Sequence, residues 1–185
     1  MNNRLTFSEP EIQTLFGHEA AEDETPARLR QYYFKNDVYD RVTADLPLRI
    51  LVGHKGVGKS ALFKVAISEG QETREFPVLI RPDDIVGLGT DTSDFLQAIR
   101  DWKKGLLAIV ARKLLATLKI ATPGLAEKVA DSTESLLDDL KNSVRQTLRS
   151  GGSANPAIVK NFLDARQVPV YIDDLDRGWE GRRRL

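Results

Sequence analysis

The stretch ILVGHKGVGKSALF, residues 50–63, carries the pattern from which we predict the fold of this chain. Gly53, four further residues, Gly58, Lys59 and Ser60 satisfy the pattern G-x-x-x-x-G-K-[ST] of a phosphate-binding P-loop. The match follows a β-branched and apolar run at 48–53 and precedes apolar residues at helical spacing. Because this pattern binds phosphate between a strand and a helix, the stretch predicts a phosphate site in that setting.

Each part of the loop has a chemical role in such a site. Glycines let backbone N–H groups turn toward phosphate oxygens, and the following helix presents its positive dipole end to the same anion. We expect Lys59 to contact the β- and γ-phosphates as a catalytic residue, and Ser60 to ligate Mg²⁺. His54 and Lys55 are assigned backbone contacts only. The predicted cofactor-binding residues are Gly53, His54, Lys55, Gly56, Val57, Gly58, Lys59, Ser60 and Ala61.

A second motif, VPVYIDDLDRGW at 168–179, places two carboxylates after an apolar run. Ligands of open α/β sheets bind at the carboxyl ends of the strands. Asp173 is therefore the predicted Mg²⁺ carboxylate of Walker B type. Asp174 stands where many ATPases of the additional-strand class carry the glutamate that polarises the attacking water, so it is the second predicted catalytic residue. An acidic pair after a strand also fits a helix cap and turn, but the complete P-loop favours the metal role.

GHKGVGKSALF and VYIDDLDRGWEGRR together resemble bacterial P-loop ATPases related to the KAP and STAND groups, many of which are found in phage-defence or other conflict systems. The resemblance covers the chain from about Tyr32 to its end. It implies ATP rather than GTP as the ligand, and a nucleotide-driven switch that controls effector or partner domains. The strand order in this class is 5-1-4-3-2.

The predicted fold class is α/β, an incomplete P-loop NTPase three-layer sandwich. Its parallel strands are expected at 48–53, 76–81 and 168–173. We expect an N-terminal helical segment at 1–45 and a partial NTPase core at 46–185, with a helical insertion at about 91–150. Further helices are expected at 8–16, 26–42, 59–68, 93–120, 124–149 and 156–166. No fourth or fifth strand follows Asp173, so we expect a protein partner or a further part of a longer ATPase to complete the sheet.

Composition restricts the function classes. Lys and Arg total 27, Asp and Glu also total 27, and there is no cysteine. The charge balance does not indicate nucleic acid as a partner, and the lack of cysteine excludes disulfides and thiolate metal sites. The longest apolar run, at 105–111, is far shorter than the roughly 20 residues that cross a bilayer. We therefore expect a cytoplasmic protein with no membrane partner, and a homo-oligomer is an open alternative.

Three functions fit these patterns. The first is an ATP-binding module that hydrolyses ATP slowly with Mg²⁺ and acts as a switch. The second is a catalytically incomplete nucleotide-binding or assembly fragment that works through its amphipathic helices at 93–149. The third is a small-molecule phosphotransferase, for which the sequence has no visible acceptor site or lid.

Overall fold

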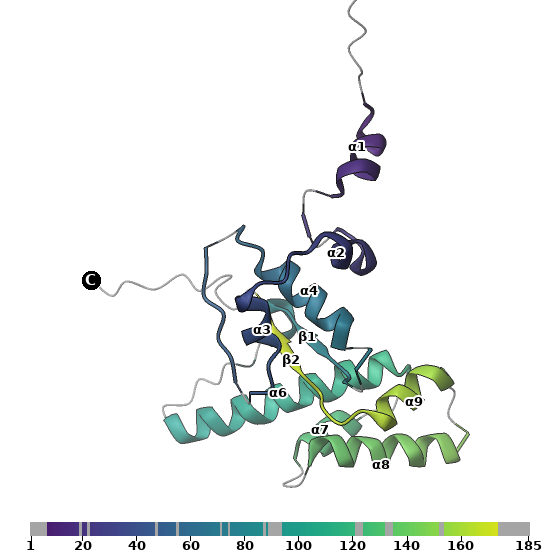
Figure 1. The fold of residues 1–185 in the computed structure, drawn as a ribbon. Coiled ribbons are helices and arrows are strands. Elements are labelled where there is room, and N and C mark those ends of the chain that lie inside the picture. The colour runs from purple at the N-terminus through teal and green to yellow at the C-terminus, as the bar shows by residue number, and fades with distance from the viewer. Residues whose placement is uncertain are drawn as a thin grey trace, which may run out of the picture. The chain divides into compact units, whose positions relative to one another are not determined.

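The computed structural model describes residues 7–18, 20–21, 23–46, 48–54, 56–70, 72–73, 75–86, 88, 94–120, 124–131, 135–151 and 154–173. Within these residues the chain is mainly helical, with one small parallel sheet (Figure 1). The chain divides into two compact units, Met1–Glu69 and Gly70–Leu185.

The first unit contains three short helices and the helix that follows the P-loop. These are α1 (Glu9–Phe16), α2 (Pro26–Tyr32), α3 (Asp37–Thr43) and α4 (Lys59–Gly70), whose last residue opens the second unit. The predicted helix at 26–42 is interrupted at 33–36. Its second part starts at Asn36, whose side chain accepts hydrogen bonds from the N–H groups of Val38 and Tyr39. This N-cap satisfies donors that a helix start leaves unpaired, so a new helix begins there.

The strand predicted at 48–53 does not form in the described residues, which corrects the prediction of an incomplete three-layer sandwich with three parallel strands. The described residues 48–54 belong to no strand and join no ladder. Leu48, Ile50 and Val52 are 77%, 81% and 88% exposed. A strand needs a neighbour that pairs its backbone N–H and C=O groups, and an apolar sequence does not supply one by itself.

The sheet of the second unit confirms the other two predicted strands, in shorter form. β1 (Val78–Ile80) pairs in parallel with β2 (Val170–Ile172), with Val78 opposite Val170 and Ile80 opposite Ile172. Parallel strands require a long connection, and here several helices, at 82–164, lie between them in the sequence. The second unit is therefore of α/β type in a broad sense, with two paired strands among the residues described.

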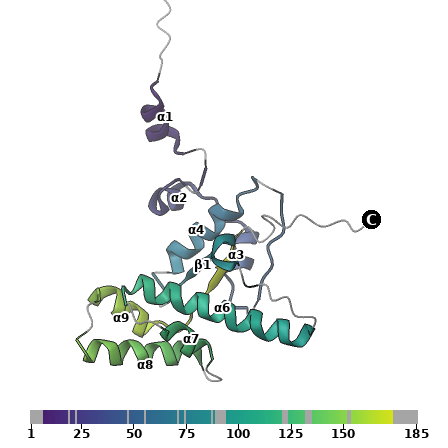
Figure 2. The same ribbon diagram turned by 180° about the vertical axis from the view of Figure 1, so that it is seen from behind.

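Helix α6 (Phe95–Thr117) forms the centre of the second unit. Figures 1 and 2 show it between the sheet on one side and α7 (Leu125–Ala130) and α8 (Leu136–Arg149) on the other. The remaining helices are α5 (Pro82–Ile85) and α9 (Pro156–Asp164). The predicted helix at 93–120 is thus confirmed, and the one predicted at 124–149 is observed as α7 and α8.

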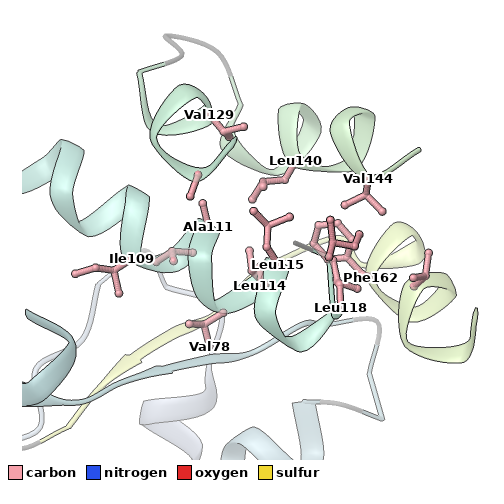
Figure 3. Packing of buried hydrophobic residues seen from close by; sticks show 14 of the residues in the cluster. Val78, Ile109, Ala111, Leu114, Leu115, Leu118, Val129, Leu140, Val144 and Phe162 are labelled. Atoms are coloured by element: carbon pink, nitrogen blue, oxygen red, sulfur yellow. The ribbon is translucent and has the colours of Figure 1, made fainter. Parts of the chain in front are cut away.

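One apolar core joins these elements (Figure 3). Leu114 of α6, Leu140 of α8 and Phe162 of α9 are fully buried in it. The ring of Phe162 meets Phe76 edge to face at 5.3 Å, which ties α9 to the segment that leads into β1. Further core residues are Val78, Ile80, Ile109, Val110, Ala111, Leu115, Leu118, Ile120, Ala126, Val129, Val144 and Val159.

The apolar stripe of α6 is covered along only part of its length. The apolar residues from Ala108 to Leu115 are buried in the core, whereas Arg112 and Lys113 lie outside it. In the first turns the stripe is exposed, at 73% for Phe95, 49% for Ile99 and 40% for Trp102. The sequence predicts the stripe correctly, but only its C-terminal half is buried against the described helices.

Candidate nucleotide-binding site

The loop before α4 has a backbone that two glycines make possible. Gly56 and Gly58 have φ angles of +86° and +89°, which side chains disfavour. Apart from the two chain neighbours of each glycine, no atom of the described residues lies within 4 Å of where a Cβ would stand. The backbone at these two positions is therefore open to a ligand that approaches closely.

Gly53 serves the loop in a different way. A Cβ on Gly53 would lie 2.9 Å from Cγ2 of Val57, so a larger residue would push the two sides of the loop apart. The turn is closed by a long hydrogen bond, 3.4 Å, from the Val57 N–H to the His54 carbonyl. The His54 side chain is exposed.

The start of α4 supplies backbone donors. The Leu62 N–H donates to the Gly58 carbonyl at 2.9 Å and forms the first hydrogen bond of the helix. The N–H groups of Lys59, Ser60 and Ala61 come before that bond and have no partner inside the helix. Together with the positive end of the helix dipole, they form a surface that suits a phosphate.

Lys59 brings its ammonium group back to the beginning of the loop. Its Nζ donates to the Gly53 carbonyl at 2.8 Å and to the His54 carbonyl at 3.1 Å. An ammonium has three donors, so one N–H is left for another acceptor. The positive charge thus lies at the loop itself, as the chemistry of an anion site requires.

The predicted metal carboxylate lies at the end of a strand in the second unit. The Asp173 N–H donates to the Ile80 carbonyl at 3.1 Å, which extends the ladder one residue beyond β2. Asp173 is partly buried. Its predicted position at the carboxyl end of a parallel strand is therefore confirmed. Asp174 and Lys55 lie outside the described residues.

A second carboxylate follows the neighbouring strand. Asp84 of α5 accepts a hydrogen bond from the Arg81 N–H at 2.7 Å and pairs with the Lys113 ammonium at 2.8 Å. Desolvation raises the pKa of Asp84, but the bonds from Lys113 and Arg81 outweigh it and hold that pKa below its usual value. Asp84 therefore stays ionised. Its carboxylate caps the start of α5 and forms an ion pair with Lys113 of α6. Among the described residues, no three His, Cys, Asp or Glu side chains are grouped closely enough to hold a metal.

In the structure the predicted loop residues lie next to one another, and α4 makes further contacts that the sequence did not reveal. Gly53, Gly56, Gly58 and the first turn of α4 lie in one loop, while Asp173 belongs to the other unit. Sequence reasoning missed that Lys64 of α4 donates to backbone carbonyls near residue 24. The only signal was a lysine that stands between the apolar residues Phe63 and Val65 of α4.

Comparisons with protein-family models, with curated proteins and with solved structures found no match to this chain. The resemblance to KAP and STAND ATPases is therefore still a prediction from the two motifs. In the described part of the chain, no helix is long and apolar enough to cross a membrane.

Proposed function

We propose that the chain binds Mg²⁺-ATP in the loop at 53–61 and acts as a slow ATPase that switches partner or effector domains. One observation carries the proposal: the loop with the complete P-loop sequence holds the Lys59 ammonium against its own carbonyls, beside the first N–H groups of α4. A folded loop with a fixed cation and open backbone donors fits the terminal phosphates of a nucleoside triphosphate.

The residues divide the proposed chemistry among them. Lys59 contacts the β- and γ-phosphates, and the Ser60 hydroxyl ligates Mg²⁺. Asp173 supplies a carboxylate to the same ion, and Asp174 polarises the water that attacks the γ-phosphorus. The products of that reaction are ADP and inorganic phosphate. We propose ATP rather than GTP as the ligand only because of the resemblance to KAP and STAND ATPases.

Calorimetric titration of the full chain with Mg²⁺-ATP tests the proposal. We expect saturable binding by the wild type and a loss of roughly 10- to 100-fold in Lys59→Ala, because hydrogen bonds to charged groups contribute about 1.5–3 kcal/mol. Lys160→Ala is the matched control, since Lys160 is an exposed lysine of α9. GTP titrated in parallel tests the choice of base. Equal affinity of Lys59→Ala and wild type would overturn the proposal.

A second function is favoured by the exposed start of α6. Phe95, Leu96, Ile99 and Trp102 lie close together in the sequence and are between 40% and 73% exposed. A contiguous apolar helix face of this kind is typical of a protein–protein contact. In this alternative the chain binds nucleotide without turnover and acts as an assembly fragment. ATP turnover that is lost in Asp174→Asn favours the ATPase, whereas binding with no turnover in the wild type favours assembly.

A further inference from the structure

The loop between α1 and α2 is built around one buried carboxylate. Glu24 is only 3% exposed and accepts hydrogen bonds from the N–H groups of Thr25 at 2.9 Å and His18 at 3.0 Å. These two bonds, with the nearby Arg28 guanidinium at 3.7 Å, hold the pKa of Glu24 below its usual value. Gly17 has a φ of +87°, and a Cβ there would lie 2.7 Å from Oε2 of Glu24. The described residues of the loop at 17–25 are therefore arranged around an ionised acid.

The helix that carries the P-loop residues is attached to this loop. Lys64 of α4 donates from Nζ to the Ala21 carbonyl at 3.1 Å and also to the Glu24 carbonyl. Lys64 follows Lys59 by five residues, which is about 7.5 Å along a helix. The proposed phosphate site and the attachment point are thus on the same short rigid element.

A second attachment lies at the other end of α4. Glu69 pairs with the Lys35 ammonium at 2.6 Å and accepts a hydrogen bond from the Tyr39 hydroxyl at 2.5 Å. Desolvation raises the pKa of Glu69, but the hydrogen bonds from Lys35 and Tyr39 have the larger combined effect. The pKa of Glu69 is therefore below its usual value, and the acid is ionised. Since isolated helices shorter than about 12–15 residues are marginal in water, α4, with 12 residues, gains order from both contacts.

From this arrangement we infer that Lys64 and Glu24 are positioning residues, which couple nucleotide binding to the docking of residues 17–32 on α4. Neither touches the nucleotide. A ligand at the first turn orders α4, which strengthens its contacts with the loop, and a docked loop orders α4 for the ligand. Such coupling is reciprocal by thermodynamic necessity. The inference rests on the proposed function, because the ligand is the Mg²⁺-ATP proposed above.

Amide hydrogen exchange of the full chain, with and without Mg²⁺-ATP, tests the coupling without any substitution. We expect saturating Mg²⁺-ATP to slow exchange in residues 17–32. Mg²⁺-ATP that binds with no change in exchange there would overturn the inference and leave the proposed function standing. Absence of Mg²⁺-ATP binding by the wild type would overturn both.

Four variants add a second readout. Lys64→Met should raise exchange in residues 17–32 and weaken Mg²⁺-ATP binding about tenfold, within the usual range of coupling between sites. Lys64→Arg, which keeps a cation with several donors, should restore both properties. Lys160→Met controls for the loss of an exposed lysine. If Lys64→Met does not fold, Glu24→Gln serves instead, because it weakens the hydrogen bonds that the Glu24 carboxylate accepts from the loop backbone. Unchanged Mg²⁺-ATP affinity in a folded Lys64→Met or Glu24→Gln variant would contradict the inference.

Discussion

Gly58→Ala isolates the contribution of the loop backbone to the proposed phosphate site. Gly58 has a φ of +89°, and no atom lies within 4 Å of where the new Cβ would stand. The methyl group therefore meets no neighbour, and the whole cost is the left-handed backbone. For an L-residue that cost is roughly 1–2 kcal/mol. The loop will relax from this conformation, and a bound phosphate must restore it.

This cost sets the expected loss of affinity. If the full 1–2 kcal/mol is taken from binding, the affinity for Mg²⁺-ATP falls about 5- to 30-fold. Calorimetric titration measures the affinity, and thermal melting followed by circular dichroism measures stability. Both are needed because part of the cost can also lower the melting temperature.

Gly124→Ala provides the matched control. Gly124 has a φ of +73° at the start of α7, and here too no atom lies within 4 Å of where a new methyl group would stand. The same substitution with the same backbone cost should lower stability but leave Mg²⁺-ATP affinity unchanged. Wild-type affinity in Gly58→Ala, or an equal loss in both variants, would refute the reasoning.

Three further predictions concern the core, the proposed metal ligand Asp173 and the N-terminal loop. Leu114→Ala removes a fully buried side chain and should destabilise the second unit by about 3 kcal/mol in urea titrations, whereas Leu96→Ala, at an exposed position of the same helix, should change stability little. Asp173→Asn should raise the Mg²⁺ concentration needed for half-maximal ATP turnover, and an unchanged Mg²⁺ dependence would exclude Asp173 as a ligand. The pKa of Glu24 is lowered in the folded chain, so its stabilising effect is fully present above its ordinary value of 4.5 and is lost as the pH falls through the folded value. Hydrogen exchange in residues 17–32, corrected for its intrinsic pH dependence, should therefore be constant from about pH 7 to 5 and rise at lower pH, with Glu24→Gln lacking this transition.

Patterns with a local cause were predictable from the sequence. The spacing of apolar residues predicts α6, because a helix repeats its buried face every three to four residues. The strands at 76–81 and 168–173 were found for a similar reason, since each is a short apolar run bounded by proline or aspartate. The loop at 53–60 was expected from its glycines, and Gly56 and Gly58 have positive φ angles that favour glycine.

The features that sequence reasoning missed depend on residues far apart in the chain. Lys64 binds carbonyls about forty positions earlier, and Glu69 binds Lys35, while spacing rules on a helix extend only to residues three or four apart. The prediction of a strand at 48–53 failed for the same reason. Its short β-branched and apolar run suits a strand, but a strand also needs a partner, and no local pattern reports whether one is present.

In the proposed function, ATP binding depends on residues that are close in the sequence, whereas hydrolysis also depends on residues far from the loop. The bonds that shape the loop join residues no more than six positions apart, from Gly53 to Leu62, so the loop forms although the segment 48–52 joins no ladder. Hydrolysis additionally requires Asp173 and Asp174, which come far later in the chain and belong to the second unit. A perturbation of the second unit should therefore reduce turnover while Mg²⁺-ATP affinity persists, and a perturbation of the loop should reduce both. Turnover that survives the loss of binding in Lys59→Ala would contradict this order of dependence.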